Sequence, residues 1–280
     1  MTGAALPASE PRILPAQRTR AWLRVLVDKL SRNSRAIVSF FDLRMDQLIS
    51  AWILVVCLAG AAMVAAAPLP PAGAGQAMAT MLPYLLVALA PIAGYRIAAG
   101  SFPRGQLSAQ PAMRLARYGK WRALNVVEAR NSPSFGPAGY MASLLVGILL
   151  NVPVRTFEFL LSVPALGPNA PAWGQTIFHA MAADVIVMNF FYMVCFVMAL
   201  RSVPLFPRML LFAWTMDIAM QFVIAQQVAN APGLPPQVGN ALIGLLEGNI
   251  QKVLISAFVW LPYLLLSDRV NITYRSRRRG

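Results

Sequence analysis

Three charged side chains stand inside long apolar segments of the sequence, each in a different segment: Arg155, Asp184 and Asp217. A charge at the centre of a membrane-spanning helix costs about 2.5–3.5 kcal/mol on insertion scales. Such a side chain therefore needs an opposite charge, water or a function. Charged groups in this setting could relay protons, bind an ion or contact a solute.

Arg155 and Asp184 are expected to form an ion pair. Arg155 lies about 7 Å beyond the midpoint of its apolar segment, and Asp184 lies about 9 Å before the midpoint of the next one, at 1.5 Å of rise per residue. Because consecutive spans run in opposite directions, the two side chains have similar depths. Glu158, three residues after Arg155, is the competing local partner. On this hypothesis Asp184→Asn destabilises the protein, and exchanging the two charges restores part of the loss.

A second group of polar residues lies near the middle of neighbouring segments. Asp217 and Gln221 are one helical turn apart, and Asn189 lies at a similar depth in the preceding segment. They could form a relay, or they could form hydrogen bonds that fix helix packing, each worth about 0.6 kcal/mol. No basic partner is evident at the depth of Asp217, so its carboxyl is either functional or protonated. The complete candidate network comprises Arg155, Glu158, Asp184, Asn189, Asp217 and Gln221.

The composition indicates that these residues belong to a membrane protein. Of the 280 residues, 58% are hydrophobic and 12% are charged, whereas soluble domains average about 45–50% and about 25%. A membrane-spanning helix needs about 20 mainly apolar residues. Six segments qualify and predict an all-α transmembrane bundle: 50–67, 79–99, 138–161, 180–200, 209–228 and 250–266. The first, second and sixth segments are expected to have interiors free of charge.

The basic residues predict how this bundle is oriented. Twenty-two of the 24 lysines and arginines lie in the N-terminal segment, the second and fourth connections and the C-terminal tail. Basic residues favour the cytoplasmic side, so both termini are expected in the cytoplasm. The arginine-rich composition suggests a bacterial source and therefore the inner membrane. The excess charge is matched to anionic lipid head groups rather than to nucleic acid.

The domain organisation follows from this topology. Residues 21–35 predict an amphipathic helix that lies on the membrane surface through Trp22, Arg24, Arg32 and Arg35, with docking on the protein itself as the alternative. A helix is also expected over 113–130. The predicted units are a cytoplasmic segment with a disordered start, two spans, a basic loop, a four-helix module and a basic tail: 1–49, 50–99, 100–137, 138–266 and 267–280.

The C-terminal half carries short motifs near the ends of two spans. Phe206-Pro207 opens the fifth span; Trp260-Leu261-Pro262-Tyr263, Ser267-Asp268-Arg269-Val270 and Thr273-Tyr274 close the sixth. On these motifs, residues 138–280 resemble a family of uncharacterised four-helix bacterial inner-membrane proteins, a domain of unknown function. The resemblance implies a four-helix module with an N-terminal extension, and it assigns no activity and no site residue.

The sequence favours a role without catalysis. It has one histidine, two cysteines inside apolar segments, no nucleotide-binding glycine motif and no nucleophile–base set. No cofactor, metal or catalytic residue is therefore expected. The first expectation is an accessory or scaffolding subunit that contacts a membrane-protein partner or a second copy. The alternative is a small-solute or ion transporter, coupled to protons, that uses Arg155, Asp184 and Asp217.

Overall fold

A computed structural model describes the backbone over residues 15–69, 71–106, 109–111, 119–167 and 169–280, and side chains from residue 33 onward within these ranges. The disordered start expected over residues 1–18 lies outside the described residues as far as residue 14, and residues 15–18 instead begin the first helix. The side chains of Trp22, Arg24 and Arg32 also lie outside the described residues. Arg35, the last of the four expected membrane-surface residues, is exposed on the first helix.

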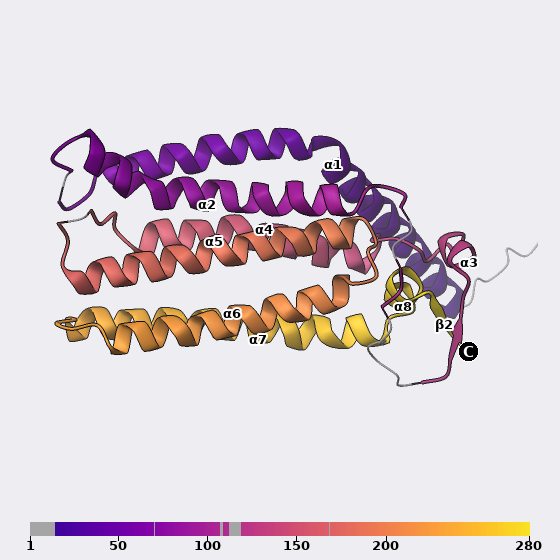
Figure 1. Cartoon of the computed structure of the whole chain (residues 1–280). Helices are drawn as coiled ribbons and strands as arrows, with labels where there is room; N and C mark the ends of the chain where they lie inside the picture. Colours follow the sequence, from indigo (N-terminus) through magenta and orange to yellow (C-terminus); the bar gives the residue numbers. More distant parts are fainter. Residues whose placement is uncertain (1–14, 70, 107–108, 112–118, 168) are drawn as a thin grey trace, which may run out of the picture.

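The six predicted spans correspond to six long helices that run back and forth in one bundle (Figure 1). Each of them is long and apolar enough to cross a membrane. Together with four short elements described below, they account for the regular structure of the described residues. Their bounds are α1 Pro15–Ala65, α2 Ala74–Ser101, α4 Tyr140–Ser162, α5 Ala172–Leu200, α6 Phe206–Ala229 and α7 Pro236–Leu266.

Three helices, α1, α5 and α7, begin well before the apolar segments that predicted them, and a proline stands at or directly before each start. α5 follows Pro171, and α7 has Pro236 as its first residue. Proline suits the first helical turn because its fixed φ matches a helix and its missing N–H would have no partner there. The earlier start of α7 places Lys252 at the middle of that helix.

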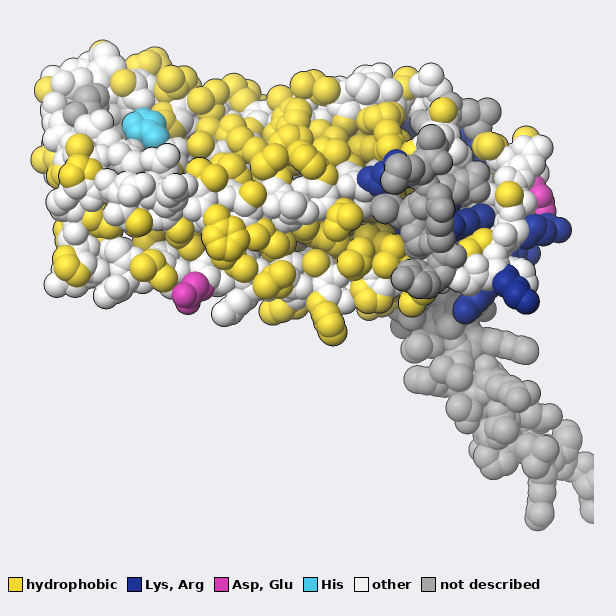
Figure 2. Space-filling model, turned by 60° about the horizontal axis from the view of Figure 1, so that its bottom comes forward, with side chains coloured by type: hydrophobic (Ala, Val, Ile, Leu, Met, Phe, Trp, Pro, Cys, Tyr) yellow, Lys and Arg dark blue, Asp and Glu magenta, His cyan; other side chains and the backbone are white. Residues whose placement is uncertain are grey.

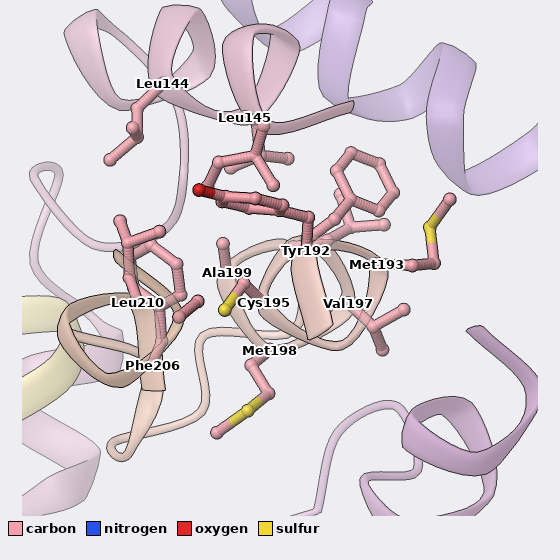
Figure 3. Packing of buried hydrophobic residues seen from close by; sticks show 14 of the residues in the cluster. Leu144, Leu145, Tyr192, Met193, Cys195, Val197, Met198, Ala199, Phe206 and Leu210 are labelled. Carbon is pink, nitrogen blue, oxygen red and sulfur yellow. The ribbon is translucent and has the colours of Figure 1, made fainter. Parts of the chain in front are cut away.

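The bundle is organised around α5, whose sequence is apolar on all sides. A helix of this kind is favoured in an interior position, and α5 packs against α2, α4 and α6. Side chains from α4 and α6 converge on α5 in the core shown in Figure 3, with Leu144 and Leu145 on one side and Phe206 and Leu210 on another. By contrast, α7 packs mainly against α6 and leaves much of its apolar surface exposed.

The contact between α2 and α5 depends on a glycine. A Cβ atom at Gly94 would lie 2.5 Å from the carbonyl oxygen of Phe190 on α5. Small residues allow such close approach of two membrane helices.

Gly94→Ala is therefore expected to destabilise the bundle by about 1–3 kcal/mol through overpacking, measured as thermal unfolding in detergent. Gly100→Ala is the matched control on the same helix, because a Cβ atom there meets nothing within 4 Å. The control should be neutral or slightly stabilising, since alanine favours a helix over glycine by up to about 1 kcal/mol. Equal effects of the two substitutions would show that the α2–α5 approach is not tight.

Short elements cover the end of the bundle at which the C-terminus lies (Figure 1). The strands β1 Trp121–Ala123 and β2 Arg277–Arg279 pair antiparallel, and the helices α3 Val126–Arg130 and α8 Asp268–Arg275 lie beside them. Of the expected helix over 113–130, the described residues 119–130 form only the short helix α3 and, before it, the strand β1. The fold is therefore mostly but not entirely helical.

The segment 267–280, expected to be a simple basic tail, is instead packed against the bundle. Tyr274 is fully buried, donates a hydrogen bond of 2.9 Å to the carbonyl oxygen of Ala199, and packs its ring 5.1 Å from that of Phe206. The neighbouring Arg275 is also buried. Burial, followed by repulsion from Arg277 and Arg208, lowers the pKa of Arg275 to about 10.

Charge is distributed unevenly along the bundle. Figure 2 shows hydrophobic side chains over the middle of the visible face, and the lysines and arginines of that face gathered at the end that carries the short elements. The connections at the other end, 66–73, 163–171 and 230–235, contain no lysine or arginine. This is the asymmetry on which the predicted orientation depends.

Candidate functional site

Arg155 lies between two carboxylates in the interior of the bundle. Its Nη1 is 2.6 Å from Asp184 Oδ2, and its Nη2 is 2.5 and 2.6 Å from the two oxygens of Asp217. The three residues are 8%, 2% and 0% exposed, respectively. The expected Arg155–Asp184 pair is therefore present in the structure, and Asp217 is a second partner of the same guanidinium.

Two expectations about these charges are wrong. Asp217 does have a basic partner, since the arginine side chain is long enough to bridge from α4 to carboxylates on both α5 and α6. Glu158 does not pair with Arg155; it forms an ion pair with Lys252 of α7 instead. The direction of the side chain decides this, because Glu158 lies on the side of α4 that faces α7.

Hydrogen bonds extend the site to a fourth helix. Tyr192 of α5 donates through its hydroxyl to Asp217 Oδ2 at 2.7 Å, and Gln221 of α6 donates to Asp184 Oδ1 at 3.2 Å. Asn249 of α7 donates in turn to Gln221 Oε1 at 3.2 Å. Each carboxylate is thus held by Arg155 and by one neutral donor.

Asn189 does not belong to this network, contrary to the grouping expected from its depth. Its Nδ2 donates to the hydroxyl of Thr156 at 2.8 Å, and its Oδ1 has no hydrogen-bond partner among the described residues. The pair joins α4 to α5 beside the charged site. Its role is consistent with helix packing.

Helical spacing positions the charged groups. Asp217 and Gln221 are four residues apart and therefore lie on one face of α6, from which Asp217 contacts Arg155 and Gln221 contacts Asp184. Arg155 is about 22 Å from the start of α4, Asp217 is about 16 Å from the start of α6, and Asp184 is about 18 Å from the start of α5, at 1.5 Å per residue. In the other direction, Arg155 is about 10 Å from the end of α4 and Asp217 is about 18 Å from the end of α6. The site thus lies inside the bundle, nearer to its non-basic end.

The charges of the site do not balance. One guanidinium faces two carboxylates, so the fully ionised group carries one net negative charge in an interior that disfavours it. Uptake of one proton by either carboxyl would remove this excess. The arrangement can therefore bind and release a proton without any covalent chemistry.

A groove between α4 and α7 reaches Arg155 from the surface of the bundle. It encloses a cavity of about 140 Å³. The polar side chains of its lining are Asn151, Arg155, Glu158, Tyr192, Asn249, Lys252 and Ser256. The side chains of Glu158 and Lys252 are 41% and 59% exposed. The groove thus brings polar and charged groups to the outer surface of two candidate spans, at the middle of α7 and one helical turn before the end of α4.

Sequence reasoning missed three residues of this region: Tyr192, Asn249 and Lys252. Lys252 had a usable signal, because it falls inside the apolar segment 250–266 that was expected to be free of charge. Tyr192 and Asn249 had none, since tyrosine is ordinary in an apolar helix and Asn249 precedes the apolar segment.

Other candidate groups do not contribute to the site. His179 is exposed near the beginning of α5, where its Nδ1 lies 2.8 Å from the carbonyl oxygen of Gln175 in the preceding turn. Across the described residues, no three or more histidine, cysteine, aspartate or glutamate side chains gather as they would to hold a metal ion.

Comparison with known proteins adds no further assignment: no family model, no curated protein and no solved structure matches this chain. The resemblance of residues 138–280 to a four-helix family therefore remains an expectation. The fold and the site define the class as a helical bundle with six candidate membrane spans and a buried charge network.

Proposed function

We propose that this chain is a multi-pass membrane protein whose basic end, carrying α3, α8, the beginning of α1 and the C-terminus, faces the bacterial cytoplasm. Support comes from the six apolar helices and from the gathering of lysine and arginine at one end of the bundle. The other end offers no basic residue in its connections.

Within this membrane protein, the Arg155 site supports transport of a small solute or ion coupled to protons. The single observation that carries the proposal is the pairing of Arg155 with Asp184 and Asp217 in the interior of the bundle. Ionisable residues inside membrane spans are costly, and they commonly mark ion and proton pathways.

Competition for Arg155 provides the coupling step. When one carboxyl takes up a proton from water, its attraction to the guanidinium weakens and Arg155 binds the other carboxylate more strongly. Asp184 is on α5 and Asp217 is on α6. Protonation of one carboxyl therefore weakens the attachment of α4 to one of these helices and strengthens its attachment to the other. Loss of the proton restores the state in which Arg155 binds both carboxylates.

Transport is tested in proteoliposomes that contain a pH-sensitive dye. A potassium gradient with valinomycin drives protons, in the presence or absence of a panel of small amino acids, organic cations and organic anions outside. The wild type should change the internal pH faster than Asp217→Asn under at least one condition. Glu158→Gln serves as the control, since it removes a carboxylate that does not contact Arg155. Equal rates for wild type and Asp217→Asn under every condition would exclude this use of the site.

The expected accessory or scaffolding role remains as a second proposal. The observation that favours it is the position of α7, which packs mainly on α6 and exposes Leu254, Ile255 and Phe258. Purification in mild detergent followed by mass spectrometry tests it. A stoichiometric membrane partner lost on substitution of Phe258 by alanine supports this role, and a homogeneous preparation without a partner argues against it.

A further inference from the structure

The exposed charges of the α4–α7 groove require an explanation that the buried site does not give. Lys252 lies 16 residues from the beginning of α7 and 14 from its end, and its partner Glu158 lies four residues before the end of α4. The pair is therefore expected just inside the lipid hydrocarbon, at the non-basic side. An exposed lysine and an exposed glutamate would be unfavourable there. Water along the groove would solvate both.

The composition of the groove matches this requirement. Asn151, Asn249 and Ser256 line it together with the Glu158–Lys252 pair. After Lys252, α7 presents apolar side chains to the outside, among them Leu254, Ile255 and Phe258, with Phe258 being 84% exposed. From Lys252 to the end of the apolar part of α7, the polar lining thus faces α4, whereas the preceding Gln251 is exposed outside the groove.

The shape of the groove indicates the end from which water enters. At the basic end, Trp260 of the lining packs against Tyr140 and Tyr263, with ring centroids 5.3 Å and 6.0 Å away. Glu158 lies four residues before the end of α4 at Ser162. The charged mouth therefore lies toward the end of the bundle whose connections carry no lysine or arginine, and the aromatic cluster closes the other end.

We propose that the α4–α7 groove is a water-filled vestibule that connects the non-basic side of the membrane with Arg155. The Glu158–Lys252 pair stands at its mouth, and Gly147 and Ser256 lie along its inner part. The occupant that suits it is a proton carried by water or a small cation, since Arg155, Lys252, Glu158, Asp184 and Asp217 together carry one net negative charge. Its use as an access route rests on the proposed transport function, whereas its hydration does not.

Cysteine labelling measures the hydration directly, because a thiol must ionise in water to react with a maleimide. Single cysteines are placed at Gly147 and Ser256 in the full chain with Cys57→Ala and Cys195→Ala. Gly147 accepts a side chain, since a Cβ atom there meets nothing within 4 Å. Phe258→Cys is the matched control, because it is highly exposed on the same helix as Ser256 and does not line the groove.

A membrane-impermeant maleimide added from the non-basic side should label Gly147→Cys and Ser256→Cys about tenfold faster or more than Phe258→Cys. Equal, slow labelling of all three would overturn the vestibule, as would labelling of the groove positions only from the basic side. A protein that labels as expected and yet carries no flux would retain the vestibule and lose the transport function. Comparison of the variants in denaturant confirms that every thiol can react when unfolded.

Discussion

Replacing Arg155 with methionine is expected to lower the free energy of unfolding by about 3–5 kcal/mol. The substitution keeps most of the side-chain volume and removes the one cation that Asp184 and Asp217 share. Both carboxylates are buried, so neither can recover the lost interaction from water. Chemical or thermal unfolding of the purified protein in detergent measures the change.

Arg96→Met is the control for the arginine substitution. Arg96 pairs with Asp46 at 2.8 Å, but the two side chains are 61% and 80% exposed, and exposed pairs contribute about 1 kcal/mol or less. The loss in Arg155→Met should also shrink at low pH, because protonation removes the unpaired negative charges. A loss as small as that of Arg96→Met would show that Arg155 does not hold the bundle together.

Simultaneous replacement of Asp184 and Asp217 by asparagine is expected to cost a similar amount, about 3–5 kcal/mol, since it leaves Arg155 buried without an anion. Each single replacement should cost far less, about 1 kcal/mol or below. With one carboxylate removed, the other still neutralises Arg155, and asparagine can still accept hydrogen bonds. The double substitution therefore exceeds the sum of the single ones by roughly 2 kcal/mol.

The four unfolding free energies, for wild type, both single variants and the double variant, form one cycle that checks this expectation. Additive losses would contradict a shared arginine. From the sequence alone, Asp184→Asn is expected to lower stability clearly, because it breaks the single predicted pair with Arg155. The structure changes that expectation, because Asp217 on α6 still neutralises Arg155 when Asp184 is replaced.

Apolar segment length and the distribution of basic residues were enough to predict six helices, because both reflect the membrane as a solvent. Helix starts were predicted less well. The mixed stretches 172–179 and 236–249 extend α5 and α7 before their apolar segments, and prolines stand where these helices begin. A hydropathy pattern does not predict such an extension. The position of Lys252 at the middle of α7 was therefore not recognised.

The sequence was enough to predict most residues of the charge site, but only part of the pairing between them. Depth along straight helices identified Arg155 and Asp184 as neighbours, whereas the reach of Arg155 to Asp217 depends on how α4, α5 and α6 pack around it. The basic tail is a similar case. Arg275 and Arg277 look like solvent-exposed charges in the sequence, but the anchoring of Tyr274 beneath Ala199 draws them into the protein.

The central claim, that the Arg155 site exchanges one proton, is tested most directly by infrared difference spectroscopy of the reconstituted protein between two pH values. Protonated carboxyl groups have a C=O band that carboxylates lack. The wild type should show a reversible carboxylic acid band. Asp184→Asn and Asp217→Asn should each lose this band, since either substitution leaves one carboxylate to balance the charge of Arg155. Glu158→Gln should retain it. A wild-type spectrum without such a band, or a band unchanged in both aspartate variants, would contradict the claim.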